Sequence, residues 1–124
     1  MTAWTAAELD TIGRAKEIDI AALRPDGTLR KPVTIWIARA GDDVYIRSAY
    51  SRTAAWYRGT QARHEGHLKA GSLSKNVTFA SVDPALNDAI DDAFRTKYSS
   101  QPAQYVNMVL TEEARFTTLK LTPR

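Results

Sequence analysis

Apolar and polar residues alternate along much of the chain, and this period of two predicts β-strands. The alternating or strand-forming runs in the first two thirds of the sequence are residues 17–23, 31–39, 44–48, 66–71 and 76–82. Within the longest of these runs, Val33, Ile35 and Ile37 share one face, whereas Thr34 and Trp36 share the other. Two further alternating runs, 105–110 and 114–121, follow Pro102 and predict a final pair of strands.

Three stretches carry helical signals instead. Thr5 and Glu8 have the spacing of a capping box, which predicts a helix over residues 6–15. Residues 53–62 show no period of two, and Thr53 is placed to act as the N-cap of a short helix. Asp83 and Pro84 are typical of a helix start. The apolar residues that follow them at helical spacing are Leu86, Ile90, Ala93, Phe94 and Tyr98.

Short turns join most of the predicted strands, at residues 25–28 and 40–43 for example. A parallel crossover needs a connection of a dozen residues or more, which the chain offers at residues 83–104 and, at most, after Ser48. About seven strands and three helices therefore predict a mainly β, α+β fold, an antiparallel barrel with peripheral helices, because closure removes exposed sheet edges. The 124 residues suit a single domain, over residues 1–124.

Composition narrows the class of protein only a little. Hydrophobic residues make up 44% of the chain and charged residues 25%, as in an ordinary globular protein. The chain has no cysteine, which excludes disulfides and thiol chemistry. We find no secretory leader and no apolar run long enough for a membrane span, and so expect a cytoplasmic protein. The net charge of +3 is concentrated in arginines of the first half, which favours an anion site on one surface.

The stretch 44–58 carries the candidate chemistry. Arg47 ends a predicted strand, and Ser48, Ser51 and Arg52 follow it closely. Guanidinium and hydroxyl groups, together with the N-terminus of the next helix, suit a phosphate group. Trp56 lies just beyond them and offers a broad apolar face, so the sequence predicts a site for a nucleotide-like cofactor. Neither a Gly-x-Gly-x-x-Gly nor a Gly-Lys-Ser/Thr loop is present, which argues against Rossmann and P-loop sites.

Three segments resemble the flavin-binding split β-barrel superfamily, which includes the pyridoxamine-phosphate oxidase-like proteins. These segments are residues 30–36, 41–48 and 55–58. The resemblance is strongest to deazaflavin-dependent nitroreductases and to an allied family of uncharacterised function. Further segments similar to that allied family lie at residues 4–5, 70–71, 76–79 and 90–98, so the resemblance covers nearly the whole chain.

The resemblance implies a homodimer that binds FMN or a deazaflavin in a cleft and transfers hydride to a small molecule. By position, it implies that Arg47 and Ser48 contact the phosphate, that Arg52 closes over it, and that Trp56 borders the ring. It also implies that two residues of the neighbouring strand, Lys31 and Thr34, face the ring edge or the phosphate. Trp36, on the opposite face from the apolar residues of its strand, would line either the cleft or a dimer interface.

The loop after Arg47 departs from those reductases, whose version is richer in glycine and contains a lysine. Tyr50 is bulky enough to compete with a cofactor for space. A cofactor-free barrel that binds a small anion or a partner protein is therefore the alternative. A nucleic-acid binder is disfavoured because the chain has no extended stripe of basic residues, and no membrane partner is expected. His64 and His67 lack the spacing of a zinc site, and no metal is expected.

Overall fold

The structure of the protein is a computed structural model that describes residues 3–49 and 51–124, with Ser51 described by its backbone. Its centre is one sheet of seven strands in the order β2-β1-β5-β6-β7-β4-β3, with every neighbouring pair antiparallel. The strands are β1 (Ile18–Ala22), β2 (Val33–Ile35), β3 (Ala38–Ala40), β4 (Asp43–Ile46), β5 (Glu65–Ala70), β6 (Leu73–Ser81) and β7 (Leu119–Pro123).

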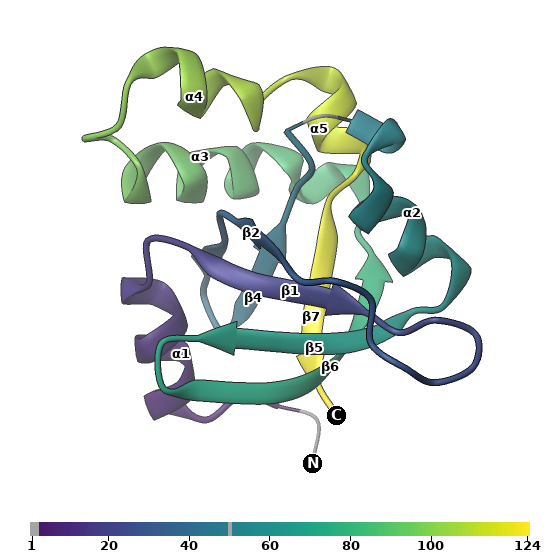
Figure 1. The fold of residues 1–124 in the computed structure, drawn as a ribbon. Coiled ribbons are helices and arrows are strands. Elements are labelled where there is room, and N and C mark those ends of the chain that lie inside the picture. Colours follow the sequence, from purple (N-terminus) through teal and green to yellow (C-terminus); the bar gives the residue numbers. More distant parts are fainter. Residues whose placement is uncertain (1–2, 50) are drawn as a thin grey trace.

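The two edges of this sheet are consecutive in the chain. β2 forms one edge and β3 the other, yet only Trp36 and Ile37 separate them. An extended chain gains at most about 3.6 Å per residue, so the edges must come close together. The sheet therefore curls on itself into a split antiparallel barrel, and in Figure 1 β1 and β5 pass in front of β4 and β7. The predicted barrel is confirmed, but the predicted single strand over residues 31–39 is wrong because it divides at this crossing.

The crossing peptide is buried and bonds to a helix instead of a strand. Ile37 is fully buried; its N–H donates to Tyr98 Oη at 3.1 Å, and its carbonyl accepts from Lys97 Nζ at 2.7 Å. Tyr98 Oη in turn donates to the carbonyl of Lys16 at 2.7 Å. The Tyr98 ring stacks on Trp36, with centroids 3.9 Å apart and planes 4° apart. The end of α3 thus satisfies backbone groups that no strand reaches.

Five α-helices and two short 3-10 helices surround the barrel in the described residues. They are α1 (Ala6–Arg14), η1 (Ser51–Thr53), α2 (Ala55–Ala62), η2 (Pro84–Leu86), α3 (Asn87–Lys97), α4 (Ala103–Met108) and α5 (Glu112–Phe116). Figure 1 shows α3 and α4 together on one side of the sheet and α2 at another. One apolar core fills the curled sheet, and a second lies where Ile90 and Phe94 of α3 pack on Tyr45 and Ala38.

Two of the three predicted helix starts are confirmed. The predicted capping box is present: Thr5 Oγ1 accepts from the N–H of Glu8, and Glu8 Oε1 accepts from the N–H of Thr5. Asp83 also caps η2, which leads directly into α3. The predicted cap at Thr53 is wrong, because Ala54 occupies the N-cap of α2 and supplies no side-chain bond.

The predicted strand over residues 105–110 is wrong, because these residues belong to α4 and the turn after it. Val106 and Val109 are three residues apart and both buried, so a helical period decided the structure where alternation was expected. The predicted strand over 114–121 is replaced by α5 and the first part of β7. Thr111 caps α5 by accepting from the N–H of Ala114. No helix in the described residues is long and apolar enough to cross a membrane.

We expect Tyr98→Phe to lower the free energy of unfolding by about 1–3 kcal/mol, because it leaves the buried N–H of Ile37 without an acceptor. Urea denaturation followed by circular dichroism measures the change. Tyr105→Phe is the matched control, since Tyr105 is 50% exposed, and it should change stability by less than about 0.5 kcal/mol. Equal effects of the two substitutions would contradict the assigned bond.

Burial lowers the pKa of Lys97 from 10.5 to about 8. Between about pH 8 and pH 10.5 the unfolded chain then binds more protons at this residue than the folded chain does. The contribution of Lys97 to the free energy of unfolding should therefore rise with pH across this interval. Urea denaturation of the wild type and of Lys97→Met at pH 7.5 and 10 tests this, with the exposed Lys69→Met as control. If the difference in free energy of unfolding between the wild type and Lys97→Met does not vary with pH, the lowered pKa of Lys97 is refuted.

Candidate functional site

A cavity of about 620 Å³ opens between the edge strand β2, the start of α2 and helix α4. Its apolar lining comes from β2, the crossing, the segment after β4, α2 and the end of α4, namely Val33, Ile35, Trp36, Ala49, Trp56, Met108 and Val109. Its polar lining is Glu17, Thr34, Arg47 and Tyr105. A mostly apolar cavity of this size with a few polar groups suits a small organic ligand.

Two indole side chains line this cavity from different elements. Trp36 comes from the barrel crossing and is backed by the ring of Tyr98. Trp56 comes from the first turn of α2, where it packs on the apolar core and meets the Tyr57 ring edge-on at 6.1 Å. Both rings are thus fixed by packing. Rigid aromatic faces of this kind stack on flat ring systems.

Arg47 lies at the inner side of the cavity, and its guanidinium is fully bonded within the protein. Its side chain is 0% exposed, and Nε donates to Thr118 Oγ1 at 2.9 Å. Nη1 donates to Asp91 Oδ1 and to the carbonyl of Val109, while Nη2 donates to Asn87 O and Oδ1 at 3.3 and 3.4 Å. A guanidinium has five N–H donors, and here five acceptors meet them. The sequence predicted a phosphate contact at Arg47, but its donors are all used.

Asp91 of α3 bonds two arginines, one on each carboxylate oxygen. Oδ1 accepts from Arg47, and Oδ2 accepts from Arg115 Nη2 at 2.8 Å and Nε at 3.1 Å. Burial acts to raise the pKa of Asp91, but hydrogen bonds from Arg115 and Arg47 outweigh it, and the pKa lies below its ordinary value. Burial lowers the pKa of Arg47, and the bond to Asp91 opposes this. The cluster joins β4, α3 and α5 behind the cavity.

Ser48 continues this internal bonding. Its N–H donates to Thr117 Oγ1 at 2.8 Å, so the segment after β4 is tied to the turn before β7. The side chain of Ser48 is fully buried, and its Oγ has no hydrogen-bond partner. Ser48 is not among the residues that line the cavity. The phosphate contact predicted for its hydroxyl therefore stays a prediction.

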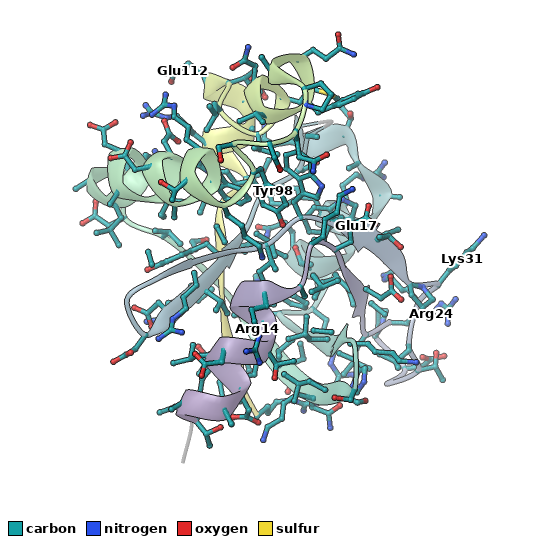
Figure 2. All side chains as sticks on the ribbon, turned by 90° about the vertical axis from the view of Figure 1, so that its left-hand side faces the viewer. Arg14, Glu17, Arg24, Lys31, Tyr98 and Glu112 are labelled. Carbon is teal, nitrogen blue, oxygen red and sulfur yellow. The ribbon has the colours of Figure 1, made fainter. Side chains whose placement is uncertain are left out.

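The other residues predicted to bind the cofactor do not all lie at the cavity. Arg52 pairs with Glu113 at 3.6 Å and covers the ring of Phe116 at 4.5 Å, and it does not line the cavity. Lys31 is exposed and extends from the edge of the molecule in Figure 2. Thr34 does line the cavity, and its hydroxyl donates to Asp19 Oδ1 at 2.7 Å. The side chain of Ser51 and all of Tyr50 lie outside the described residues.

The structure thus brings Thr34, Arg47 and Trp56 to one cavity, out of the seven residues that the sequence predicted. It adds Glu17, which Figure 2 shows near Tyr98 at the centre of the view, and Tyr105 and Met108 of α4. The α4 residues were missed because residues 105–110 were predicted as a strand. Pro102, which is the N-cap of α4, was the signal that could have identified the helix.

Two other places in the described residues gather polar side chains, but these side chains bond one another. A cavity of about 510 Å³ lies under the N-terminal segment, but its charged groups pair across it, Lys120 with Asp43 at 3.4 Å for example. His67, the second histidine of the His-Glu-Gly-His run, has Asn76 Oδ1 at 3.0 Å and Ser74 Oγ at 2.7 Å from its two ring nitrogens. Across residues 3–49 and 51–124, no three His, Asp or Glu side chains are grouped to hold a metal ion.

A family model describing uncharacterised proteins conserved in bacteria, DUF2255, matches residues 8–121 of this chain. The chain belongs to this family. No curated protein matches the chain significantly. The family identity agrees with the resemblance to a family of uncharacterised function that the sequence predicted.

Several solved structures share the fold. HutZ, the heme storage protein of Vibrio cholerae, is 8% identical with a TM-score of 0.64, covering 93% of this chain and 86% of its own. An F420 reductase is 18% identical with a TM-score of 0.54, covering 93% and 90%. A Listeria innocua protein provisionally assigned as a pyridoxamine 5'-phosphate oxidase is 7% identical with a TM-score of 0.58, covering 94% and 88%. These likenesses establish the split-barrel fold of the pyridoxamine-phosphate oxidase type.

We expect Asp91→Asn to destabilise the protein by about 3–5 kcal/mol, because it leaves the buried charge of Arg47 without its counter-ion. Asp92→Asn is the matched control from the next position of α3. Asp92 is exposed and pairs with Arg95 at the surface, so its loss should cost less than about 1 kcal/mol. Guanidinium chloride denaturation measures both, and similar values would contradict the assigned role of Asp91.

The same bonds predict an acid dependence. The pKa of Asp91 is lower in the folded protein than in the unfolded chain. The contribution of Asp91 to the free energy of unfolding is therefore complete above the unfolded carboxyl pKa of about 3.9, and it is lost as the pH falls through the folded pKa. The stability difference between the wild type and Asp91→Asn should therefore shrink below about pH 4.

Proposed function

We propose that the cavity binds the flat ring system of a flavin or a deazaflavin, and that the protein acts as an oxidoreductase on a small molecule. The observation that carries the proposal is one cavity of about 620 Å³ lined by two rigid indoles, Trp36 and Trp56. The volume fits a tricyclic ring within the usual range for organic ligands. The apolar side chains of Val33, Ile35 and Met108 complete a surface that excludes water from such a ring.

The relatives of the fold support the same class of ligand. F420 is a deazaflavin, and pyridoxamine 5'-phosphate oxidase and heme storage are named for the other two structures. All three names involve flat heteroaromatic molecules. Among the described residues that line the cavity there is no histidine or cysteine, the usual strong ligands of heme iron. This absence favours a flavin or deazaflavin over heme.

A bound flavin or deazaflavin supplies hydride transfer itself, so the protein has to bind and orient rather than donate or abstract protons. We assign Trp36 and Trp56 to the faces of the ring. Thr34 and Glu17 offer oxygen acceptors to its polar edge. Arg47 and Ser48 stabilise the segment that forms the inner wall. The contacts predicted for Lys31, Ser51 and Arg52 stay predictions.

We further propose a homodimer, because one ring at the cavity and another on α5 are exposed aromatic surface. Tyr105, at the cavity, is 50% exposed, and Phe116, one helix further along the chain, is 65% exposed. A second copy placed over α4 and α5 would cover both rings and close the cavity to water. The partner could then contribute residues to the same ligand.

The alternative is a cofactor-free barrel that binds a small anion or a partner protein. The anion option requires a cation with unused donors, and Arg47, the basic residue in the described lining, has none. The exposed rings of Tyr105 and Phe116 leave the partner option in place. A binding experiment with a flavin separates the flavin-binding function from the cofactor-free alternative, because only flavin binding requires an open cavity.

We expect riboflavin and 5-deazariboflavin to bind saturably, with quenching of their fluorescence by the neighbouring indoles. Ala49→Phe should weaken the binding at least tenfold, since Ala49 lines the cavity and a phenyl group would fill it. Ala7→Phe, an exposed position of α1, is the control and should bind as the wild type does. Fluorescence titration gives the dissociation constants. Absence of binding by both compounds, or binding unaffected by Ala49→Phe, would count against the proposal, and saturable hemin binding in their place would favour heme.

A further inference from the structure

We infer that the cavity selects a flat ligand that carries no phosphate, a riboflavin-like rather than an FMN-like molecule. This inference rests on the proposed function and concerns the charge of the ligand. It follows from three features of the described lining: a saturated guanidinium, an unpaired carboxylate and a hydroxyl whose proton is already bonded. Each feature disfavours a phosphate and none disfavours the ring. The fourth polar residue of the lining, Tyr105, is 50% exposed and offers a neutral hydroxyl, which brings no charge to compensate a phosphate.

The guanidinium of Arg47 has no donor left for a phosphate oxygen. Its five N–H groups meet acceptors on Thr118, Asp91, Val109 and Asn87. Its positive charge is paired with the carboxylate of Asp91, which it shares with Arg115, while Arg115 pairs with Asp88 as well. A phosphate could bond Arg47 only by breaking a buried hydrogen bond and leaving its acceptor unsatisfied, which would oppose binding. Arg47, the arginine of the described lining, therefore gives an anion little attraction.

Glu17 gives the lining a negative charge. It precedes β1, lines the cavity and is exposed, and no Lys, Arg or His nitrogen of the described residues lies within 4.0 Å of its carboxylate. A phosphomonoester carries nearly two negative charges at neutral pH, and within one cavity these charges and the carboxylate of Glu17 would repel each other. Glu17 thus disfavours a phosphate at the cavity and tolerates a neutral tail.

Thr34 presents an acceptor rather than a donor. Its hydroxyl proton points to Asp19 Oδ1 at 2.7 Å, so only oxygen lone pairs remain for a ligand. The oxygens of Glu17 and Thr34 match N–H donors such as the imide of a flavin ring. They cannot bond the oxygens of a phosphate. Arg52 and Lys31, the other two cations predicted to lie near a phosphate, are outside the lining.

The test compares riboflavin with FMN by fluorescence titration at pH 7.5 and low salt. We expect riboflavin to bind at least tenfold more tightly than FMN. Glu17→Gln should raise the affinity for FMN severalfold and change that for riboflavin less than twofold, because it removes the repulsion and keeps an oxygen acceptor. Asp42→Asn is the control: it removes one negative charge from an exposed turn outside this cavity and should leave the ratio unchanged.

The outcomes separate the inference from the proposed function. FMN binding as tightly as riboflavin, or more tightly, would overturn the inference and leave the flavin site intact. A preference for riboflavin that Glu17→Gln does not reduce would refute the role given to Glu17. If neither compound binds, the proposed function fails, and the inference fails with it.

Discussion

The fold depends on how one peptide crosses between the two edges of the sheet. Ile37 lies where the chain leaves β2 and enters β3, so its backbone groups have no strand partner, yet it is fully buried. At the end of α3, Tyr98 Oη accepts from the N–H of Ile37, and Lys97 Nζ donates to its carbonyl. Without them, burial of the crossing would leave two polar groups unsatisfied, at a cost of about 1–3 kcal/mol each. The position of α3 therefore follows from the closure of the barrel.

The same crossing positions the cavity. Trp36 precedes Ile37, stacks on Tyr98 from one side and lines the cavity. Behind the same cavity, the cluster of Arg47, Asp91 and Arg115 joins the end of β4 to α3 and α5. α3 thus contributes both to the crossing, through its C-terminal end, and to the buried ion pair, through its middle. The crossing at Ile37 and the Arg47–Asp91 pair each satisfy buried polar groups, and together they position the walls of the cavity.

The extent to which the sequence predicted this structure varies with the kind of signal. The capping box at Thr5 and Glu8 and the strands over 17–23, 66–71 and 76–82 were predicted because they depend on local pattern. The break at Trp36 depends on barrel closure, a long-range constraint that leaves the alternation of residues 31–39 unchanged. The helix α4 was missed because Val106, Met108 and Leu110 alternate as in a strand, whereas the buried pair Val106 and Val109 has the spacing of a helix. Trp56 and Thr34 were predicted at the cavity, but Arg47 shows that residue type does not reveal whether donors are free.

Arg47 also explains why likeness of fold is a weak guide to the ligand. An arginine at a strand end beside an aromatic cavity suggests an anion site, and one structure with the same barrel is named for pyridoxamine 5'-phosphate. A charged side chain can serve a ligand only with donors that the protein does not itself use. Here Asp91, Thr118, Val109 and Asn87 use them all, because a buried guanidinium is stable only when fully bonded. The identity of the ligand therefore depends on which polar groups remain unused, and in this cavity those include the oxygens of Glu17 and Thr34 and the hydroxyl of Tyr105.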